Sequence, residues 1–443
     1  MTGGKKRARV GAPAFFLGTA LLCLIGTGRQ GSSGEGPAQK STLDNGLTVI
    51  LDIDESSPTT ILQILVKGGK RAEPAGKRGL SFLTTRLSVE IPDSSKVQEL
   101  MSLATRFSVT ALADHSLINI ECLTENLDAS LKVLSKIILD PLFSGIRIEA
   151  VKKHMEHQGR IEEDDSVRLG HLAGLGAFFA GTPYEGSIYG DKESLKAIKN
   201  RDVADFYGRY FIGPNIVLSL SSDLPGKTLL DLVGKYFAKI PKGEPVSFEP
   251  VSASDPKERA IHTDRDTKQT YVCLAYRLPE VSPRNFALAT LLENLLGKGP
   301  GSRLWPLRTE KKLAYNVSCR ATQMQSGGVI EAYLETDNSK METAKAVLRQ
   351  TILDLYQNGL SEEELAHTKT AAIADFIREN ETKSGKVATL AYFESVGLGL
   401  SYFSGLSSEI GALTLDQVNA FIRSTLAPEK ALEVVIGSKP GEE

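Results

Sequence analysis

The chain has 443 residues, of which 41% are hydrophobic and 24% are charged, a composition typical of globular proteins. Its 52 Lys and Arg residues against 54 Asp and Glu residues leave a formal net charge of -2. The balance of charges gives no sign of a basic surface for nucleic acid, and the sequence has no basic stripe, so we expect no nucleic-acid partner. The length is sufficient for two domains of roughly 200 residues, each with its own core.

The first forty residues predict an export segment. Basic residues at positions 5–9 precede an apolar run at 14–25, and small residues follow it. The run of about 12 residues is short for a membrane-spanning helix, which needs about 20. We therefore expect export to a bacterial periplasm, with an uncleaved segment anchored in the inner membrane as the alternative. Residues 29–40 are rich in Gly and Ser and predict a flexible spacer.

Ordered sequence is expected from about Thr42, with strands and helices in alternation. Runs of β-branched residues predict strands, and apolar residues at helical spacing predict helices. The predicted elements of the first half are strands at 47–51 and 61–66, helices at 79–89 and 97–105, a hairpin at 108–113 and 117–122, and helices at 127–139 and 148–163.

Four prolines and a glycine between residues 240 and 256 indicate an interdomain linker. The order of elements then returns, with a strand at 270–276, helices at 286–296 and 304–312, a hairpin at 315–321 and 329–334, and helices at 341–357 and 361–380. The predicted domains are an export signal with spacer (1–40), an N-terminal domain (41–243), a linker (244–258) and a C-terminal domain (259–443).

An internal repeat relates the two halves. Val203 and Phe206 precede a proline and an apolar strand, and Val418 and Phe421 do the same 215 residues later. The matching order of elements favours two tandem copies of one α+β domain, each a mixed β-sheet backed by helices.

The segment 79–85 reads Gly-Leu-Ser-Phe-Leu-Thr-Thr, and the segments 44–49, 66–73 and 181–190 flank it in a specific order. Together they resemble the pitrilysin/insulinase family of zinc metallopeptidases over about residues 41–438. In that family the helix reads G-L-x-H-x-x-E-H, in which two imidazoles bind zinc and the glutamate is the general base.

The resemblance implies that the zinc site is lost. Ser81 and Thr85 stand where the two histidines would be, Thr84 stands for the glutamate, and Gln158 stands for the third ligand. Neutral hydroxyl and amide groups are poor ligands for zinc. We therefore expect a pseudo-peptidase that has no metal, no cofactor and no catalytic residue of its own.

The second half keeps a further family motif, L-R-x-x-x-x-L-[AG]-Y, at residues 307–315. The resemblance implies that Arg308 and Tyr315 reach the substrate backbone across a chamber. Arginine supplies donors that do not titrate, and a tyrosine hydroxyl can donate to an oxyanion. The alternative is a surface ion pair for Arg308 and a strand start at Tyr315.

The expected function is that of a non-catalytic, zinc-less subunit forming half of a clam-shaped peptidase chamber. Its partner would be an active zinc-peptidase subunit that carries H-x-x-E-H, in a heterodimer or a larger complex, and the substrate would be a peptide. One alternative is a scaffold or peptide-binding pseudo-peptidase without a role in proteolysis. A second is an independent metallohydrolase that uses His154 and His157.

Overall fold

The computed structural model describes residues 38–91 and 93–438, which lie in one compact unit. No helix among these residues is long and apolar enough to cross a membrane. The export signal that the sequence predicts falls on residues 1–37, outside the described part of the chain.

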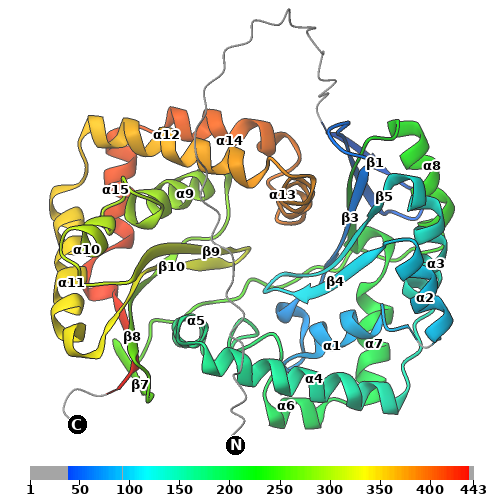
Figure 1. The fold of residues 1–443 in the computed structure, drawn as a ribbon, viewed down its shortest axis with the longest axis horizontal. Helices are drawn as coiled ribbons and strands as arrows, with labels where there is room; N and C mark the ends of the chain where they lie inside the picture. Colours follow the sequence, from blue (N-terminus) through cyan, green and yellow to red (C-terminus); the bar gives the residue numbers. More distant parts are fainter. Residues whose placement is uncertain (1–37, 92, 439–443) are drawn as a thin grey trace, which may run out of the picture. The chain divides into compact units, whose positions relative to one another are not determined.

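The N-terminal half contains one mixed sheet and helices around it (Figure 1). Its strands are β1 (Gln39–Thr42), β2 (Thr48–Ile53), β3 (Thr59–Lys67), β4 (Arg106–Ala111), β5 (His115–Leu123) and β6 (Ile216–Ser222). Its helices are α1 (Leu80–Leu87), α2 (Ser94–Ser102), α3 (Leu127–Leu139), α4 (Gly145–Asp164), α5 (Ser166–Phe178), α6 (Lys192–Ala197), α7 (Asn200–Tyr210) and α8 (Gly226–Phe237). The strand order is β1-β2-β6-β3-β5-β4.

The C-terminal half follows an extended segment at 241–256. Its strands are β7 (Ala260–Asp264), β8 (Gln269–Leu278), β9 (Asn316–Met324), β10 (Gly327–Asp337) and β11 (Leu432–Gly437). Its helices are α9 (Pro283–Gly297), α10 (Trp305–Thr309), α11 (Met341–Asn358), α12 (Glu362–Glu379), α13 (Lys383–Ser395), α14 (Ser401–Ala412) and α15 (Leu415–Thr425). The strand order is β7-β11-β8-β10-β9.

The two halves share one topology, which confirms the predicted α+β repeat. Without β1, the first sheet runs β2-β6-β3-β5-β4, and the second sheet repeats this order strand for strand. In each sheet the first pair, β2 with β6 or β7 with β11, is parallel, and the later pairs are antiparallel. The repeated Val-x-x-Phe pairs lie on α7 and α15, each directly before the last strand of its half.

Three local predictions are wrong in detail. The helix expected at 304–312 is the five-residue α10, because Lys312 adopts a positive φ of 53° that a helix cannot contain. The helix expected at 97–105 lies at Ser94–Ser102: Asp93 caps its start through the amide of Ser95, and Ala104 has a φ of 52° beyond its end. Strand β1 begins before Thr42, in a polar segment without an alternating pattern.

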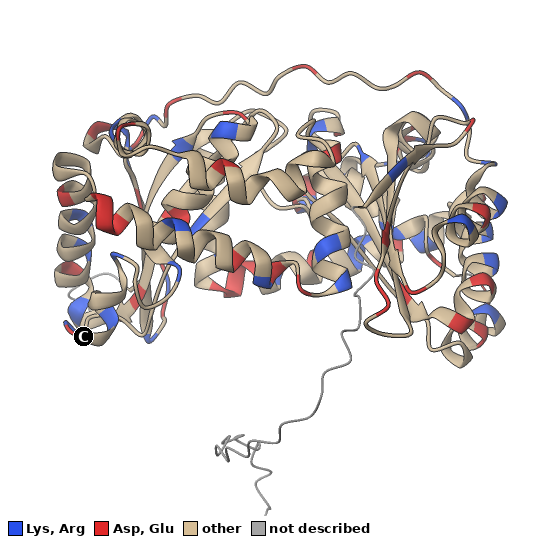
Figure 2. Cartoon of the chain, turned by 90° about the horizontal axis from the view of Figure 1, so that it is seen from above, with Lys and Arg blue, Asp and Glu red and all other residues tan. Residues whose placement is uncertain are grey.

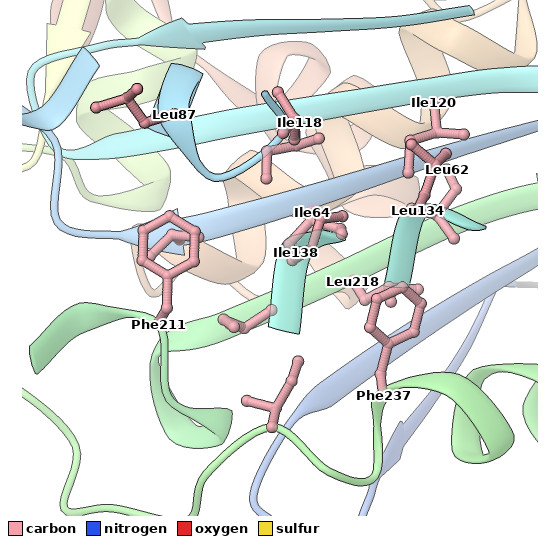
Figure 3. Packing of buried hydrophobic residues seen from close by; sticks show 14 of the residues in the cluster. Leu62, Ile64, Leu87, Ile118, Ile120, Leu134, Ile138, Phe211, Leu218 and Phe237 are labelled. Atoms are coloured by element: carbon pink, nitrogen blue, oxygen red, sulfur yellow. The ribbon is translucent and has the colours of Figure 1, made fainter. Parts of the chain in front are cut away.

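Each sheet buries side chains on both faces. Along β8, Val272, Leu274 and Tyr276 belong to one hydrophobic cluster, and the alternate residues Tyr271 and Cys273 belong to another, as the two-residue period of a strand requires. Figure 3 shows the larger cluster of the N-terminal sheet, where side chains from β3, β5 and β6 meet those of α1 and α3.

The second face of each sheet is covered by a helix from the other half. Helix α5 packs on β8 and β11, and α13, which begins 217 residues later, packs on β3 and β6 (Figure 1). Leu390 and Ala391 of α13 lie in one buried cluster with Leu65 and Val217 of the N-terminal sheet. Gly170 of α5 lies so close to Tyr271 that a Cβ would stand 2.2 Å from the ring. The two domains are therefore interlocked.

Buried polar groups anchor α13 and α5, the two helices exchanged between the halves, to the sheets that they cover. Lys386 of α13 pairs at 2.9 Å with Asp52, which is 1% exposed. Lys383 donates to the carbonyl of Thr59 at 2.8 Å. On the other side, His171 of α5 lies 2.5 Å from the carboxylate of Glu331. Elsewhere on the helices acidic and basic residues are interspersed (Figure 2).

A buried ion pair of the N-terminal half, Arg71 with Asp114, contacts the linker and the C-terminal half. Their side chains are 3% and 9% exposed and 3.2 Å apart. Arg71 also donates to the side chain of Gln325 at the tip of the β9–β10 hairpin. The backbone N–H of Gln325 donates to the carboxylate of Asp114 at 2.8 Å. The Tyr184 hydroxyl donates to the same carboxylate, and Arg71 lies over the ring of Phe248 in the linker, 4.7 Å from its centre.

We predict that Asp114→Asn lowers the free energy of unfolding by about 2–4 kcal/mol, because it leaves the buried Arg71 without its counter-charge. Urea unfolding measures this loss. The control is Asp231→Asn, which breaks an exposed pair with Lys227 and should cost less than about 1 kcal/mol. Equal effects of the two substitutions would contradict the role of Asp114.

Candidate functional site

The degenerate zinc motif lies on α1, in a closed environment. Gly79 begins the helix with a φ of 90°, and a Cβ at this position would stand 2.9 Å from the carbonyl oxygen of Tyr189. Ser81, Thr84 and Thr85 are all 0% exposed. A catalytic centre must admit its substrate, and these three side chains have no access to solvent.

Glu73 lies in the loop before α1, and its side chain caps the first turn of this helix. Its carboxylate accepts hydrogen bonds from the Ser81 amide at 2.9 Å and the Ser81 hydroxyl at 2.6 Å, and from the Gly79 amide at 3.2 Å. These bonds satisfy amides that the first turn of a helix leaves free, and an acid at this end suits the helix dipole. The residue in place of the first zinc ligand is thus held by a cap within the chain.

The remaining motif positions do not fit a zinc ion either. The Thr85 hydroxyl donates to the Ser81 carbonyl at 2.8 Å, and the Thr84 hydroxyl is buried with no partner among the described residues. Gln158, half-buried on α4, offers only a neutral amide. In the described part of the chain, no group of three or more His, Cys, Asp or Glu residues could hold a metal.

Two buried titratable side chains, Lys70 and Glu73, which the sequence did not predict as part of the site, lie beside α1. Lys70 is 4% exposed and donates to the carbonyls of Tyr184, at 2.8 Å, and Gly186. Burial lowers the pKa of Lys70 to about 8 and raises the pKa of Glu73 to about 7, against the hydrogen bonds from Ser81. Glu73 and Ser81 are eight residues apart in the sequence, and no local motif joins them, so the sequence alone did not indicate their contact.

The histidines of the metallohydrolase alternative are on the outer face of α4. His154 and His157 are both exposed, whereas Met155 between them is 0% exposed and packs toward Gly79. The face of α4 that meets α1 therefore carries neither histidine.

The structure places Arg308 and Tyr315 on either side of the turn between α10 and β9. Arg308 is exposed, and its guanidinium carbon lies 5.2 Å from the centre of the Trp305 ring. Among the described residues it has no ion-pair partner. Tyr315 is 55% exposed, and its hydroxyl donates to Asp337 at 2.9 Å, which raises the pKa of the tyrosine. Tyr315 directly precedes β9, and its amide donates to the Glu335 carbonyl at 2.9 Å. A role of the pair in binding substrate stays a prediction.

Comparison with known proteins identifies the family. A family described as insulinase (peptidase family M16) matches residues 48–191, and one described as peptidase M16 inactive domain matches residues 197–372. The chain belongs to peptidase family M16. The resemblance to insulinase-type peptidases that the sequence suggested is therefore confirmed.

The relatives of this chain include a protein named as a non-peptidase homologue and a subunit of a larger complex. The chain is 24% identical over 382 residues to the "Non-peptidase homolog YmxG" of Helicobacter pylori, covering 85% of this chain and 88% of that protein. The "Cytochrome b-c1 complex subunit 1, mitochondrial" of Bos taurus is 26% identical over 205 residues, 45% of this chain and 42% of that protein. The crystal structure of a peptidase M16 inactive domain from Pseudomonas fluorescens has a TM-score of 0.82 and 21% identity, and the match covers 92% of this chain and 99% of that one. The chain thus has the M16 fold, and its relatives include one that is named as a non-peptidase homologue.

We predict that Glu73 makes stability fall as pH rises. In the folded chain Glu73 keeps its proton up to a pKa of about 7, whereas in the unfolded chain it releases it near 4.5. The folded state thus binds more protons between these values, so stability from this group is full below about pH 4.5 and is lost by about pH 7, by roughly 3 kcal/mol.

Glu73→Gln should remove this component, because the amide stays neutral throughout. Urea unfolding of both proteins across this pH range measures the difference between their stability curves. Parallel curves for wild type and variant would show that the Glu73 carboxyl group titrates alike in the folded and unfolded states.

Proposed function

We propose that this chain is the non-catalytic, zinc-free subunit of a heteromeric zinc metallopeptidase. The observation that carries the proposal is the closed motif helix: Ser81, Thr84 and Thr85 are fully buried, and Glu73 holds Ser81. The M16 fold is kept in both halves, which supports a role as a chamber-forming subunit. The catalytic zinc would be in the partner, on an H-x-x-E-H helix.

Assembly with a partner is supported by a relative that is itself part of a complex. The bovine relative is by its name a subunit of a larger complex. In our proposal the present chain likewise acts within a complex, as a heterodimer or a larger assembly, and closes the chamber around an unfolded peptide.

The peptide would be held in part by strand addition. Strand β4 lies at the edge of its sheet, and its residues Arg106 and Ser108 are exposed. An extended peptide can add a further strand to such an edge. The matching outer strand, β9, is less available, because the Ala321 amide already donates to Glu293 at 3.2 Å. Arg308 and Tyr315 would contact the same peptide from the C-terminal half.

The alternative of a scaffold or peptide-binding pseudo-peptidase has one observation in its favour. The Tyr315 hydroxyl, which would serve an oxyanion, is engaged by Asp337 of the same chain. In this alternative Arg308 and Tyr315 have no role in proteolysis.

Purification of the tagged chain from the envelope fraction of its native host tests the proposal. A stoichiometric second chain with H-x-x-E-H and about one zinc per complex would support the heteromeric peptidase. A lone chain without zinc would support the scaffold alternative, and zinc in the lone chain would contradict both.

We predict that Arg308→Ala lowers kcat/KM of the reconstituted pair by the equivalent of about 2–4 kcal/mol while assembly is unchanged, because it removes a donor to the reacting peptide. Peptide hydrolysis and size-exclusion chromatography measure the two effects. The control is Arg423→Ala, which removes an exposed arginine of α15. An unchanged rate in Arg308→Ala would remove this residue from the mechanism.

We predict a smaller loss, about 1–2 kcal/mol, for Tyr315→Phe, since the ring remains and only the hydroxyl is lost. If the hydroxyl acts on the transition state, kcat falls and KM stays constant. A change in KM alone would assign Tyr315 to binding of the peptide.

A further inference from the structure

A cavity of about 520 Å³ lies in the C-terminal half, where α11 and the residues after α15 meet β8 and β11. Its apolar walls include Leu274 of β8, Ile352 of α11 and Leu426 directly after α15. Four polar or charged side chains complete this lining: Arg259, Tyr276, Arg349 and Glu433. An apolar space of this size with a few polar groups is the usual form of a small-molecule site.

The N-terminal half has larger apolar side chains at the equivalent position. Helices α7 and α15 begin 215 residues apart, so Phe211 directly after α7 corresponds to Leu426. With the same spacing, Leu218 of β6 corresponds to Glu433 of β11. Phe211 and Leu218 belong to one buried cluster (Figure 3). The C-terminal half therefore has a smaller side chain and a carboxylate where its counterpart is filled with an aromatic ring and a leucine.

Glu433 orients one arginine at the cavity. It is 7% exposed, and its Oε2 accepts a hydrogen bond from the Nε of Arg349 at 2.8 Å and lies 2.6 Å from the Nη2. A buried carboxylate needs such a partner, so the position of the guanidinium is well defined. Its Nη1 has no hydrogen-bond or ion-pair partner among the described residues, which leaves donors for a ligand.

Arg259 adds a second positive charge to the lining. Its Nη1 donates to the Lys430 carbonyl at 3.2 Å. Its nearest acid, Asp255, is 3.8 Å away and 76% exposed, and such an exposed pair compensates little of the charge. The cavity is thus lined by two guanidinium groups and one carboxylate, and this excess of positive charge favours an anionic ligand.

Tyr276 contributes a buried hydroxyl to the same space. The residue is 3% exposed and lines the cavity, and its hydroxyl has no hydrogen-bond partner in the part of the chain that the structure describes. Burial raises the pKa of Tyr276, and the nearby charge of Arg349 opposes this rise. The hydroxyl therefore keeps its proton and lies close to the arginine. A buried hydroxyl without a partner is costly, so the site is suited to a ligand that supplies an acceptor.

We propose that this cavity binds a small apolar molecule that carries one carboxylate group. The carboxylate accepts hydrogen bonds from the two arginines and from the Tyr276 hydroxyl, which matches the planar donor geometry of guanidinium groups. The hydrocarbon part lies against the apolar walls. The site requires neither a partner subunit nor proteolysis, so it is independent of the function proposed above.

Isothermal titration calorimetry of the full chain at low ionic strength tests the site. The probe is octanoate, and octanamide, which has the same hydrocarbon chain without the charge, is the matched control. We expect octanoate to bind and octanamide to bind at least about tenfold more weakly, because it forms no charge-assisted hydrogen bonds. The dipeptide acetyl-Leu-Leu with a free carboxylate tests whether the carboxyl end of a peptide binds instead.

Two variants locate the carboxylate. Tyr276→Phe keeps the ring and removes the hydroxyl, so the affinity for octanoate should fall about fivefold, while the melting temperature stays unchanged because the hydroxyl has no partner to lose. Arg259→Gln should lower the affinity for octanoate about tenfold and leave that for octanamide unchanged. The control is Tyr356→Phe on α11, outside the cavity lining, which should have no effect.

A third variant fills the space. Leu426→Phe introduces the side chain that the N-terminal half carries as Phe211, so octanoate should no longer bind while the melting temperature is retained. Binding of octanoate to folded Leu426→Phe with unchanged affinity would place the ligand elsewhere and overturn the proposal.

The remaining outcomes are equally distinct. Octanoate binding that weakens in Tyr276→Phe and Arg259→Gln supports the site. Absence of octanoate binding, equal affinity for octanamide, or unchanged affinity in both variants would overturn the proposal. Binding of acetyl-Leu-Leu without binding of octanoate would overturn the assignment to a small free acid.

Discussion

Neither sheet of this protein has both faces covered by its own half of the chain. One face of each sheet carries the larger cluster of its domain, and a helix from the opposite domain packs on the other face. Fully burying a side chain such as Leu65 or Leu390 contributes about 2 kcal/mol, and that contribution is lost if the halves separate. The exchange of α5 and α13 therefore makes two similar domains into one cooperative unit.

Helix α1 is held in place by several contacts within the chain. Structural zinc often contributes folding energy directly, and around α1 protein groups supply comparable anchoring contacts. Glu73 caps its first turn, Met155 and the 184–190 segment cover it, and Arg71 ties the loop before Glu73 to the C-terminal hairpin. Once such contacts carry the stability, the residues at the metal positions are free to become small and neutral, as Ser81 and Thr85 are.

The sequence predicted most of the fold and part of the site. Long periodic segments such as α12 and the strand β8 were readable, because their apolar spacing reports burial directly. The interlocking was not, since the pattern of α13 shows that it has an apolar face but not which sheet that face meets. The neutral residues Ser81, Thr84 and Thr85 at the motif positions were readable from the sequence, and the absence of zinc that they imply stays a prediction. The contact of Glu73 with Ser81 depends on tertiary packing that no local pattern encodes.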